Sequence, residues 1–389
     1  MKLINYLLFF SSLSFFRSFK LIYYLNSKNK TDILFYYPQY LSHQSRLPKC
    51  IVPLIKSIKK NNLSYIVIEE PNLYQRKPRT KKADSFDFLW ILVIIFRKFY
   101  KGNDYGKIDV KIGILLSKIL CINRDIKNVI TISQSLQSFF KGMFPNATLY
   151  DYQHGLISLK YNGYICENSV AKHIIKNKSN VLLYGTNFQN KLLNSKGGKY
   201  FKKHSFVIGS TSFKEYRRPK KSFNGNILFS LQFTQSHSRK LNEFLLDKTI
   251  KFFDKIESNK LNFNIYIKNH PRFDNCISID NLYNYKFVKN APSDLEHCFR
   301  ICSLHITEYS TVLFNSIRAG APTLLTRFSN RLNIYEEEYG FPSDSICLIN
   351  DYDKINNDLF FNKLINKQLK WSKKLFEPYN EKKFIELFI

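Results

Sequence analysis

The chain has 389 residues, which is enough for two domains that each bury a hydrophobic core. Hydrophobic residues make up 44% of the sequence and aromatic residues 16%, which excludes an intrinsically disordered protein. The net charge of +30 favours contact with an anionic partner, such as membrane headgroups, nucleic acid or a phosphorylated substrate. Because no nucleic-acid-binding motif accompanies the charge, nucleic acid is not expected as a partner.

Two apolar stretches and the cysteines indicate a cytoplasmic protein that touches a membrane. The 7 cysteines occur singly, without a C-x-x-C pair, which fits reduced thiols. Residues 1–16 have no small-x-small cleavage site and are too short to span a bilayer, so we expect a helix that is buried or lies on a membrane surface. The run 86–96 predicts a buried helix, with a membrane-dipping helix as the alternative. We expect peripheral association with the inner face of an anionic cell membrane.

In the first half of the chain, short β-branched and aromatic runs alternate with helical segments. This alternation predicts a parallel sheet covered on both faces. A helix is expected over 134–140, and strands are expected at 32–37, 64–68, 128–133, 147–152 and 180–185. We assign a first domain to residues 1–215.

The second half repeats this pattern after a basic stretch, 217–224, that reads as an interdomain linker. Ser293, with Glu296 three places later, predicts a capped helix. Strands are expected at 226–230, 263–268, 285–288, 304–307 and 323–326, and helices at 238–257 and 311–318. We assign a second domain to residues 225–352 and a helical segment, packing back on the first domain, to 353–389. The expected fold class is α/β, with two Rossmann-like doubly wound domains facing across a cleft.

A histidine follows the strand expected at 147–152. His154 precedes Gly155, which allows a sharp turn and a close approach by a ligand. An imidazole at the carboxyl edge of a strand can accept a hydroxyl proton near neutral pH. Asp151, two residues before Gln153, either orients the loop or is itself the base.

Cationic side chains follow the strand expected at 263–268. Lys268, His270 and Arg272 alternate there, and Pro271 fixes the direction of the chain. Three such donors at a strand end predict a diphosphate site.

A further anion site is expected where the strand 304–307 gives way to a helix. Glu308 precedes Tyr309, and Ser310 or Thr311 can cap the helix so that its free N–H groups face the loop. Ser310 can also donate its hydroxyl to a phosphate. No cluster of residues with metal-ligand spacing is visible, so neither a metal nor another cofactor is expected.

Taken in order, four motifs resemble those of the two-Rossmann-domain (GT-B) transferases of bacterial surface polysaccharide synthesis. They are Gln153-His154-Gly155, Lys268-Asn269-His270-Pro271, Thr307-Glu308-Tyr309-Ser310-Thr311 and Ala319-Gly320-Ala321-Pro322. This group includes capsule and lipopolysaccharide glycosyltransferases and the related CDP-glycerol glycerophosphotransferases of teichoic acid synthesis. The likeness spans residues 145–326.

The resemblance implies roles for individual residues. His154 is the base in an acceptor-binding first domain, and His270 stabilises the donor phosphate in a nucleotide-binding second domain. Ser310 and Thr311 hold phosphate at the helix start. Two positions depart from the pattern: Asn315 stands where many members carry an acidic residue that binds ribose, and Glu308 stands where the glycerophosphotransferases prefer aspartate.

The implied function is an inverting, metal-independent glycosyltransferase that moves a sugar from a nucleotide-activated donor. Its acceptor is a glycan or a lipid-linked chain of a capsule or a lipopolysaccharide. The first alternative is a CDP-polyol phosphotransferase of the teichoic-acid type. The second is a non-enzymatic basic protein that binds a membrane surface or nucleic acid.

Overall fold

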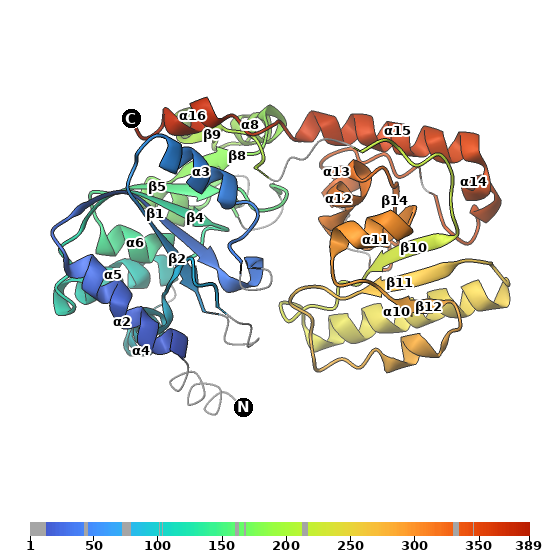
Figure 1. Cartoon of the computed structure of the whole chain (residues 1–389), viewed down its shortest axis with the longest axis horizontal. Coiled ribbons are helices and arrows are strands. Elements are labelled where there is room, and N and C mark those ends of the chain that lie inside the picture. Colours follow the sequence, from blue (N-terminus) through green and yellow to red (C-terminus); the bar gives the residue numbers. More distant parts are fainter. Residues whose placement is uncertain are drawn as a thin grey trace. The chain divides into compact units, whose positions relative to one another are not determined.

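The computed structural model describes residues 13–42, 46–71, 79–100, 102, 104–159, 163–166, 169–211, 217–329, 334–344 and 346–389. The chain forms two compact units. Unit 1 comprises Met1–Phe213 with Leu375–Ile389, and unit 2 comprises Lys214–Lys374. Each unit is built on one parallel sheet with helices around it, which confirms the α/β class and the two Rossmann-like domains expected from the sequence (Figure 1).

Unit 1 holds a seven-stranded parallel sheet in the order β3-β2-β1-β4-β5-β8-β9. The central strands are buried on both faces, as β1 shows. Its residues Leu34 and Tyr36 belong to one hydrophobic core, and Ile33 and Phe35 belong to a second core on the opposite face of the sheet. The strands are β1 (Lys30–Pro38), β2 (Tyr65–Glu70), β3 (Asp84–Ser85), β4 (Asp125–Ile132), β5 (Thr148–Tyr152), β8 (Asn180–Leu183) and β9 (Ser205–Val207). An antiparallel hairpin, β6 (Ile165–Cys166) and β7 (Ser169–Val170), lies outside this sheet.

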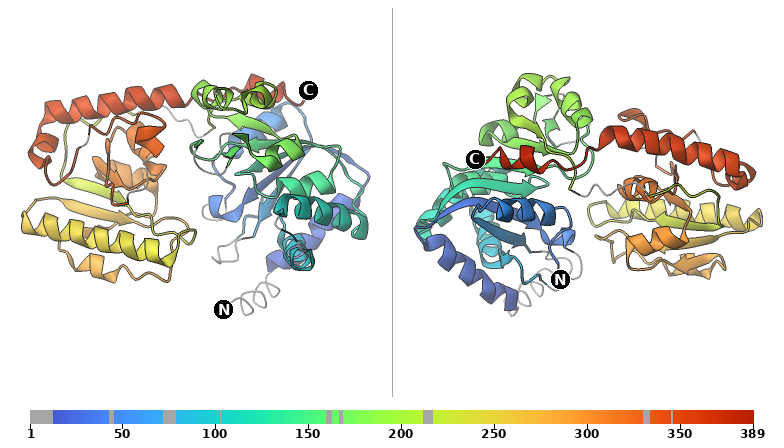
Figure 2. Two further views of the ribbon diagram at one scale, coloured as in Figure 1. Left: turned by 180° about the vertical axis from the view of Figure 1, so that it is seen from behind. Right: turned by 45° about the horizontal axis from the view of Figure 1, so that its top comes forward.

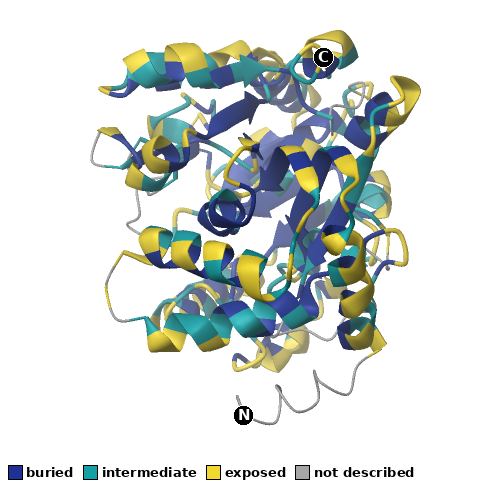
Figure 3. Cartoon of the chain, turned by 90° about the vertical axis from the view of Figure 1, so that its left-hand side faces the viewer, coloured by how far each residue is buried: buried dark blue, intermediate teal, exposed yellow. Residues whose placement is uncertain are grey.

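Helices cover both faces of the unit 1 sheet. One face packs against α2 (Leu13–Asn26), α4 (Asp87–Phe99), α5 (Tyr105–Ile119) and α6 (Gln137–Met143). The other packs against α3 (Val52–Lys60) and α16 (Glu381–Ile385). The remaining helices of the unit are η1 (Gln39–Leu41), α7 (Lys172–Asn177), α8 (Thr186–Leu193) and α9 (Gly198–His204). Figure 3 shows the outcome: buried strands, and helices exposed on their outer sides.

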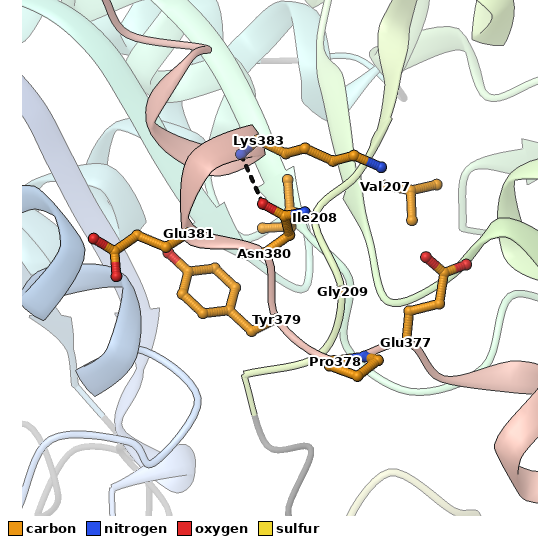
Figure 4. A pocket seen from close by; sticks show the side chains of 9 residues that line it. All are labelled: Val207, Ile208, Gly209, Glu377, Pro378, Tyr379, Asn380, Glu381 and Lys383. Atoms are coloured by element: carbon orange, nitrogen blue, oxygen red, sulfur yellow. Dashed lines mark hydrogen bonds between the residues drawn. The ribbon is translucent and has the colours of Figure 1, made fainter.

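The C-terminal segment extends unit 1 beyond β9. Ser210 N–H donates to Glu377 O at 2.9 Å, and Asn380 N–H donates to Ile208 O at 2.8 Å. Between the two segments lies a pocket of about 490 Å³, lined by Val207, Ile208, Gly209, Glu377, Pro378, Tyr379, Asn380, Glu381 and Lys383 (Figure 4). None of the site residues expected from the sequence lines this pocket.

Unit 2 holds a five-stranded parallel sheet in the order β12-β11-β10-β13-β14 (Figure 2). Its strands are β10 (Asn226–Ser230), β11 (Asn264–Lys268), β12 (Val288–Asn290), β13 (Leu304–Thr307) and β14 (Thr323–Leu325). The main core joins the sheet to α10 (Arg239–Ser258) and α15 (Asp358–Leu375), and a smaller one joins it to α11 (Leu295–Ile301). The other helices are η2 (Asp280–Asn284), α12 (Val312–Arg318), α13 (Ile334–Glu337) and α14 (Tyr352–Asn356).

Three local expectations are wrong. The helix expected from residue 134 begins at Gln137, because Ser133, Gln134 and Leu136 have positive φ angles that a right-handed helix excludes. Asp294, not Ser293, caps α11, since its side chain accepts the His297 N–H at 2.9 Å. The strand expected at 285–288 is instead β12, because Val288 N–H bonds back to Tyr285 O in a turn.

The structure describes the two segments expected near a membrane to different extents. Residues 1–12 lie outside the described residues, so only the end of the first expected helix is seen, at the start of α2. The run 86–96 forms most of α4, and Leu89, Ile91 and Val93 are buried in unit 1. Among the described helices, none combines the length and apolar character that crossing a bilayer requires.

Candidate functional site

The sheet of unit 2 brings three loops together at one edge. Strand β10 pairs with β11 on one side and with β13 on the other, so the order of the strands reverses at β10. In open α/β sheets, ligands bind outside the carboxyl ends of the strands at such a reversal. His237 follows β10, His270 follows β11, and Tyr309 follows β13.

His270 is held as a neutral hydrogen-bond donor. Its Nδ1 accepts the Arg272 backbone N–H at 3.0 Å, so the proton of the neutral ring belongs on Nε2. Burial, together with smaller electrostatic contributions from Arg272 and His237, lowers the pKa of His270 to about 4. At neutral pH the ring therefore presents an Nε2–H group without carrying a charge.

A second histidine, His237, was not among the residues that the sequence motifs indicated. Its Nδ1 lies 3.1 Å from Asn242 Oδ1, and its Nε2 lies 2.7 Å from the Tyr309 hydroxyl. Asn242 on α10 is fully buried, and its amide also bonds the backbone of Thr234 and the carboxylate of Asp274. One amide therefore fastens the loop of His237 to the loop that follows His270.

Only one sequence signal could have identified His237. His237 lies in a polar run, residues 234–238, that comes soon after a buried strand. Tyr309 lay inside a recognised motif but was given no role there.

Lys268 and Glu308, both expected at a phosphate, have structural partners in unit 2. Lys268 Nζ donates to Pro292 O and Ser293 O, each at 2.8 Å. The buried Glu308 carboxylate accepts the backbone N–H groups of Phe328 and Ser329 at 2.8 Å, and the hydroxyls of Ser329 and Thr326. The contacts of Glu308 hold the loop after β14, and those of Lys268 hold the loop after β12.

Ser310, Thr311 and Asn315 lie where β13 gives way to α12. Ser310 is buried, and its Oγ accepts the Val312 N–H at 3.2 Å. Its hydroxyl hydrogen has no acceptor among the described residues. Thr311 is the N-cap of α12 without a side-chain capping bond, and both it and Asn315 are exposed to solvent. Arg272 is partly exposed on the neighbouring loop.

A pocket of about 230 Å³ lies at the carboxyl ends of β4 and β5 in unit 1. It is lined by Ser133, Gln134, Asp151, Gln153, His154, Leu156, Ile157, Ser158, Gly163 and Tyr164. Unit 1 thus brings together Asp151 and His154, the two candidate bases. Ser133 and Gln134, which form one wall of the pocket, have φ angles of +64° and +59°. Such backbone conformations are strained for non-glycine residues, and they occur most often at functional sites.

Asp151 is completely buried in the floor of this pocket. Its Oδ1 accepts the Thr131 hydroxyl at 2.9 Å and the Gln134 N–H at 2.6 Å, and its Oδ2 accepts the Tyr164 hydroxyl at 2.5 Å. Burial raises the pKa of Asp151 to about 7, although the three hydrogen bonds oppose the rise. The carboxyl group therefore titrates close to neutral pH.

His154 stands at the exposed side of the same pocket. Gly155 has a φ of +79°, which lets the chain turn directly after the histidine. Gln153 is buried and fixes the turn, since its Nε2 donates to Gly155 O at 2.8 Å and its Oε1 accepts the Tyr184 N–H at 2.9 Å. The ring of Tyr40 meets the His154 ring edge-on at a centroid distance of 6.4 Å. The imidazole is therefore accessible while its backbone is fixed.

A partly buried carboxyl group, Glu70 at the end of β2, was not among the residues that the sequence motifs indicated. Glu70 accepts the Ser135 hydroxyl beside the strained loop, and burial raises its pKa. Strand β1 pairs with β2 and β4, so unit 1 has its strand-order reversal next to Glu70. Across the described ranges, no group of three or more His, Cys, Asp or Glu side chains is placed to hold a metal ion.

Comparison with known proteins identifies solved structures with a similar fold. No protein-family model and no curated protein matches the sequence. Three solved structures superimpose over most of the chain. A UDP-GlcNAc 2-epimerase from Methanocaldococcus jannaschii, in complex with UDP-GlcNAc and UDP, gives a TM-score of 0.51 at 14% identity over 92% of this chain and 98% of that chain.

The other two comparisons are similar in quality. S. aureus MnaA with UDP gives a TM-score of 0.50 at 10% identity, over 92% of this chain and 94% of that chain. A variant of the wall teichoic acid polymerase TagF gives 0.50 at 12% identity, over 95% of this chain and 91% of that chain. The chain has the GT-B fold. At such identities the likeness establishes the architecture alone, because one fold supports many reactions.

Proposed function

We propose that the protein is an inverting, metal-independent glycosyltransferase. It moves a sugar from a nucleotide-activated donor to a growing bacterial surface polysaccharide, a capsule or a lipopolysaccharide, on a glycan or lipid-linked acceptor. Unit 2 binds the donor and unit 1 binds the acceptor. The observation that carries the proposal is the neutral, preoriented His270 imidazole at the strand-order reversal of unit 2.

The unit 2 site suits a diphosphate that becomes a leaving group. His270 Nε2–H and the Ser310 hydroxyl are hydrogen-bond donors, and the Arg272 guanidinium adds positive charge. Donors fixed in advance stabilise the negative charge that develops on the departing phosphate oxygen. Asn315, exposed one turn into α12, binds the ribose in this scheme.

His154 takes the proton of the acceptor hydroxyl in this scheme. The hydroxyl oxygen then forms a bond to the anomeric carbon, while the bond from that carbon to the nucleotide phosphate breaks. Its electron pair leaves on the phosphate, and the configuration inverts. Asp151 is the alternative base, because its carboxyl titrates near 7, but three hydrogen bonds enclose it.

Replacement of the two histidines tests the assignment. His154→Ala should lower turnover by roughly 10²–10⁴-fold and leave nucleotide affinity nearly unchanged, because only a general base is lost. His270→Ala should weaken both. His297→Ala, an exposed histidine on α11, is the matched control. Nucleotide affinity is read from the thermal shift that each nucleotide produces, and turnover from transfer to the acceptor. Normal turnover by folded His154→Ala would exclude His154 as the base.

A second candidate is a CDP-polyol phosphotransferase, which the TagF-like architecture favours, although Glu308 stands where the glycerophosphotransferases prefer aspartate. The released nucleotide and the product distinguish the two. A sugar transferase adds no phosphorus to the acceptor, whereas a polyol phosphotransferase releases CMP and adds phosphorus. Chelator should leave activity intact. Conversion of a nucleotide sugar without any acceptor would indicate an epimerase and overturn both proposals.

A further inference from the structure

The outer face of α2 carries large apolar side chains that unit 1 leaves uncovered. Leu13 is 77% exposed, Phe16 58% and Tyr23 76%. The inner face of the same helix, with Phe15, Leu21 and Leu25, is buried. A surface helix normally has one apolar face, directed to the core. Helix α2 has two, and the core uses only one of them.

Positive charge surrounds this outer face. Residues 13–31 include no aspartate or glutamate, but they include Arg17, Lys20, Lys28 and Lys30. Lys20 extends its ammonium over the Tyr24 ring at 5.3 Å. The carboxylate that interacts electrostatically with Arg17 and Lys20 is Asp84, which is partly buried. The face is therefore aromatic and cationic.

The charge of the whole chain is concentrated in the same unit. Unit 1 contains 35 of the 60 lysines and arginines, but only 13 of the 30 acidic residues. In unit 2, the numbers of basic and acidic residues are much closer to each other. An anionic partner is thus attracted mainly to unit 1.

Helix α4 lies beside α2 (Figure 1). The two helices pack through Phe19 and Phe88, whose ring centroids are 4.8 Å apart. Ile95 and Phe99 in the last turns of α4 are 41% and 76% exposed, next to the exposed Lys98. Its middle belongs to the core.

We propose that the outer face of α2 docks unit 1 onto an anionic lipid bilayer, with the helix lying in the plane of the interface. Phe16, Phe19 and Tyr23 enter the boundary between headgroups and acyl chains, while Arg17 and Lys20 reach the lipid phosphates. A lipid surface suits the face better than a protein partner, because Arg17 and Lys20 lie on the same helix as the exposed aromatic residues and the carboxylate that interacts with both cations, Asp84, is partly buried. This inference goes beyond the proposed reaction and stands without it.

Vesicle binding by the full-length protein tests the proposal. Two vesicle types are used, phosphatidylcholine alone and phosphatidylcholine mixed with phosphatidylserine. We expect binding to the mixed vesicles only. Phe16→Ser combined with Tyr23→Ser should reduce partitioning at least roughly tenfold at any salt concentration, because it removes the inserted apolar surface. Lys20→Glu should reduce it mainly at low salt, because exposed charges are screened.

Two matched controls distinguish docking through α2 from nonspecific hydrophobic or electrostatic binding to vesicles. Phe244→Ser removes an aromatic residue of α10 that is 39% exposed, and Lys199→Glu with Lys202→Glu reverses charge on α9. Both should leave partitioning within about twofold, because surface substitutions away from the docking face act weakly. All variants replace exposed side chains, and unchanged melting temperatures verify their folds.

Three outcomes would overturn the proposal. The first is unchanged partitioning of the Phe16 and Tyr23 variant. The second is an equal loss in the α9 variant, which would mean diffuse attraction by the net charge. The third is self-association that the α2 variant abolishes without any effect on vesicle binding, which would assign the face to a second copy of the chain.

Discussion

The ionisation of Asp151 makes a specific prediction about stability. The carboxyl of an unfolded chain ionises near pH 4, whereas burial raises the pKa of folded Asp151 to about 7. Between these values the unfolded state loses its proton and the folded state keeps it. Stability must therefore fall as the pH rises from about 4 to 7. A difference of about three pKa units corresponds to ~4 kcal/mol of unfolding free energy, and complete burial leaves no solvent screening to reduce it.

Asp151→Asn should abolish this loss. The amide oxygen can still accept from Thr131 and Gln134, and the amide nitrogen can donate to the Tyr164 hydroxyl. The stability of the variant relative to wild type should thus rise by ~4 kcal/mol between pH 4 and pH 7.5. Because other carboxylates titrate equally in both proteins, the difference isolates Asp151.

Urea unfolding of the full chain measures the effect. Trp90 is the tryptophan of unit 1 and Trp371 that of unit 2, so a Trp371→Phe background reports on unit 1. Asp125→Asn, at an exposed site on β4, is the control and should show no such trend. A difference between Asp151→Asn and wild type that stays constant with pH would refute the reasoning. Turnover also tests the choice of base: loss of activity in folded Asp151→Asn, together with near-normal turnover of folded His154→Ala, would favour Asp151 over His154.

Two further predictions concern unit 2. Because His270 is already neutral and already a donor, nucleotide affinity should stay level from pH 6 to 8, as isothermal titration can show; a steady decline above about pH 6.5 would mean that an imidazolium is required. Glu308→Gln should lower the stability of unit 2 by about 1–3 kcal/mol, because an amide nitrogen would face N–H and hydroxyl donors. Thermal unfolding followed by Trp371 fluorescence measures this, and an unchanged melting temperature would count against a structural role for Glu308.

The positions of two candidate site residues could be predicted from the sequence, because they depend only on neighbouring residues in the chain. A buried strand followed closely by a histidine predicts a histidine at a sheet edge, and His154 and His270 both lie at one. The role of Glu308 could not be predicted this way. Its partners are 18 to 21 residues further along the chain, and only the fold shows that the carboxylate is already occupied. His237 was missed for the same reason, since its partners Asn242 and Tyr309 belong to other elements.

The sequence by itself determined the alternation of strands and helices, the parallel class of the sheets and the presence of two units. It could do so because hydrophobic periodicity is a local property that each segment expresses independently. The tertiary structure alone decided the order of the strands, the burial of Asp151 beneath a strained loop, and which face of α2 the core leaves open. Those features depend on which distant segments pack together, and no single stretch of chain encodes that.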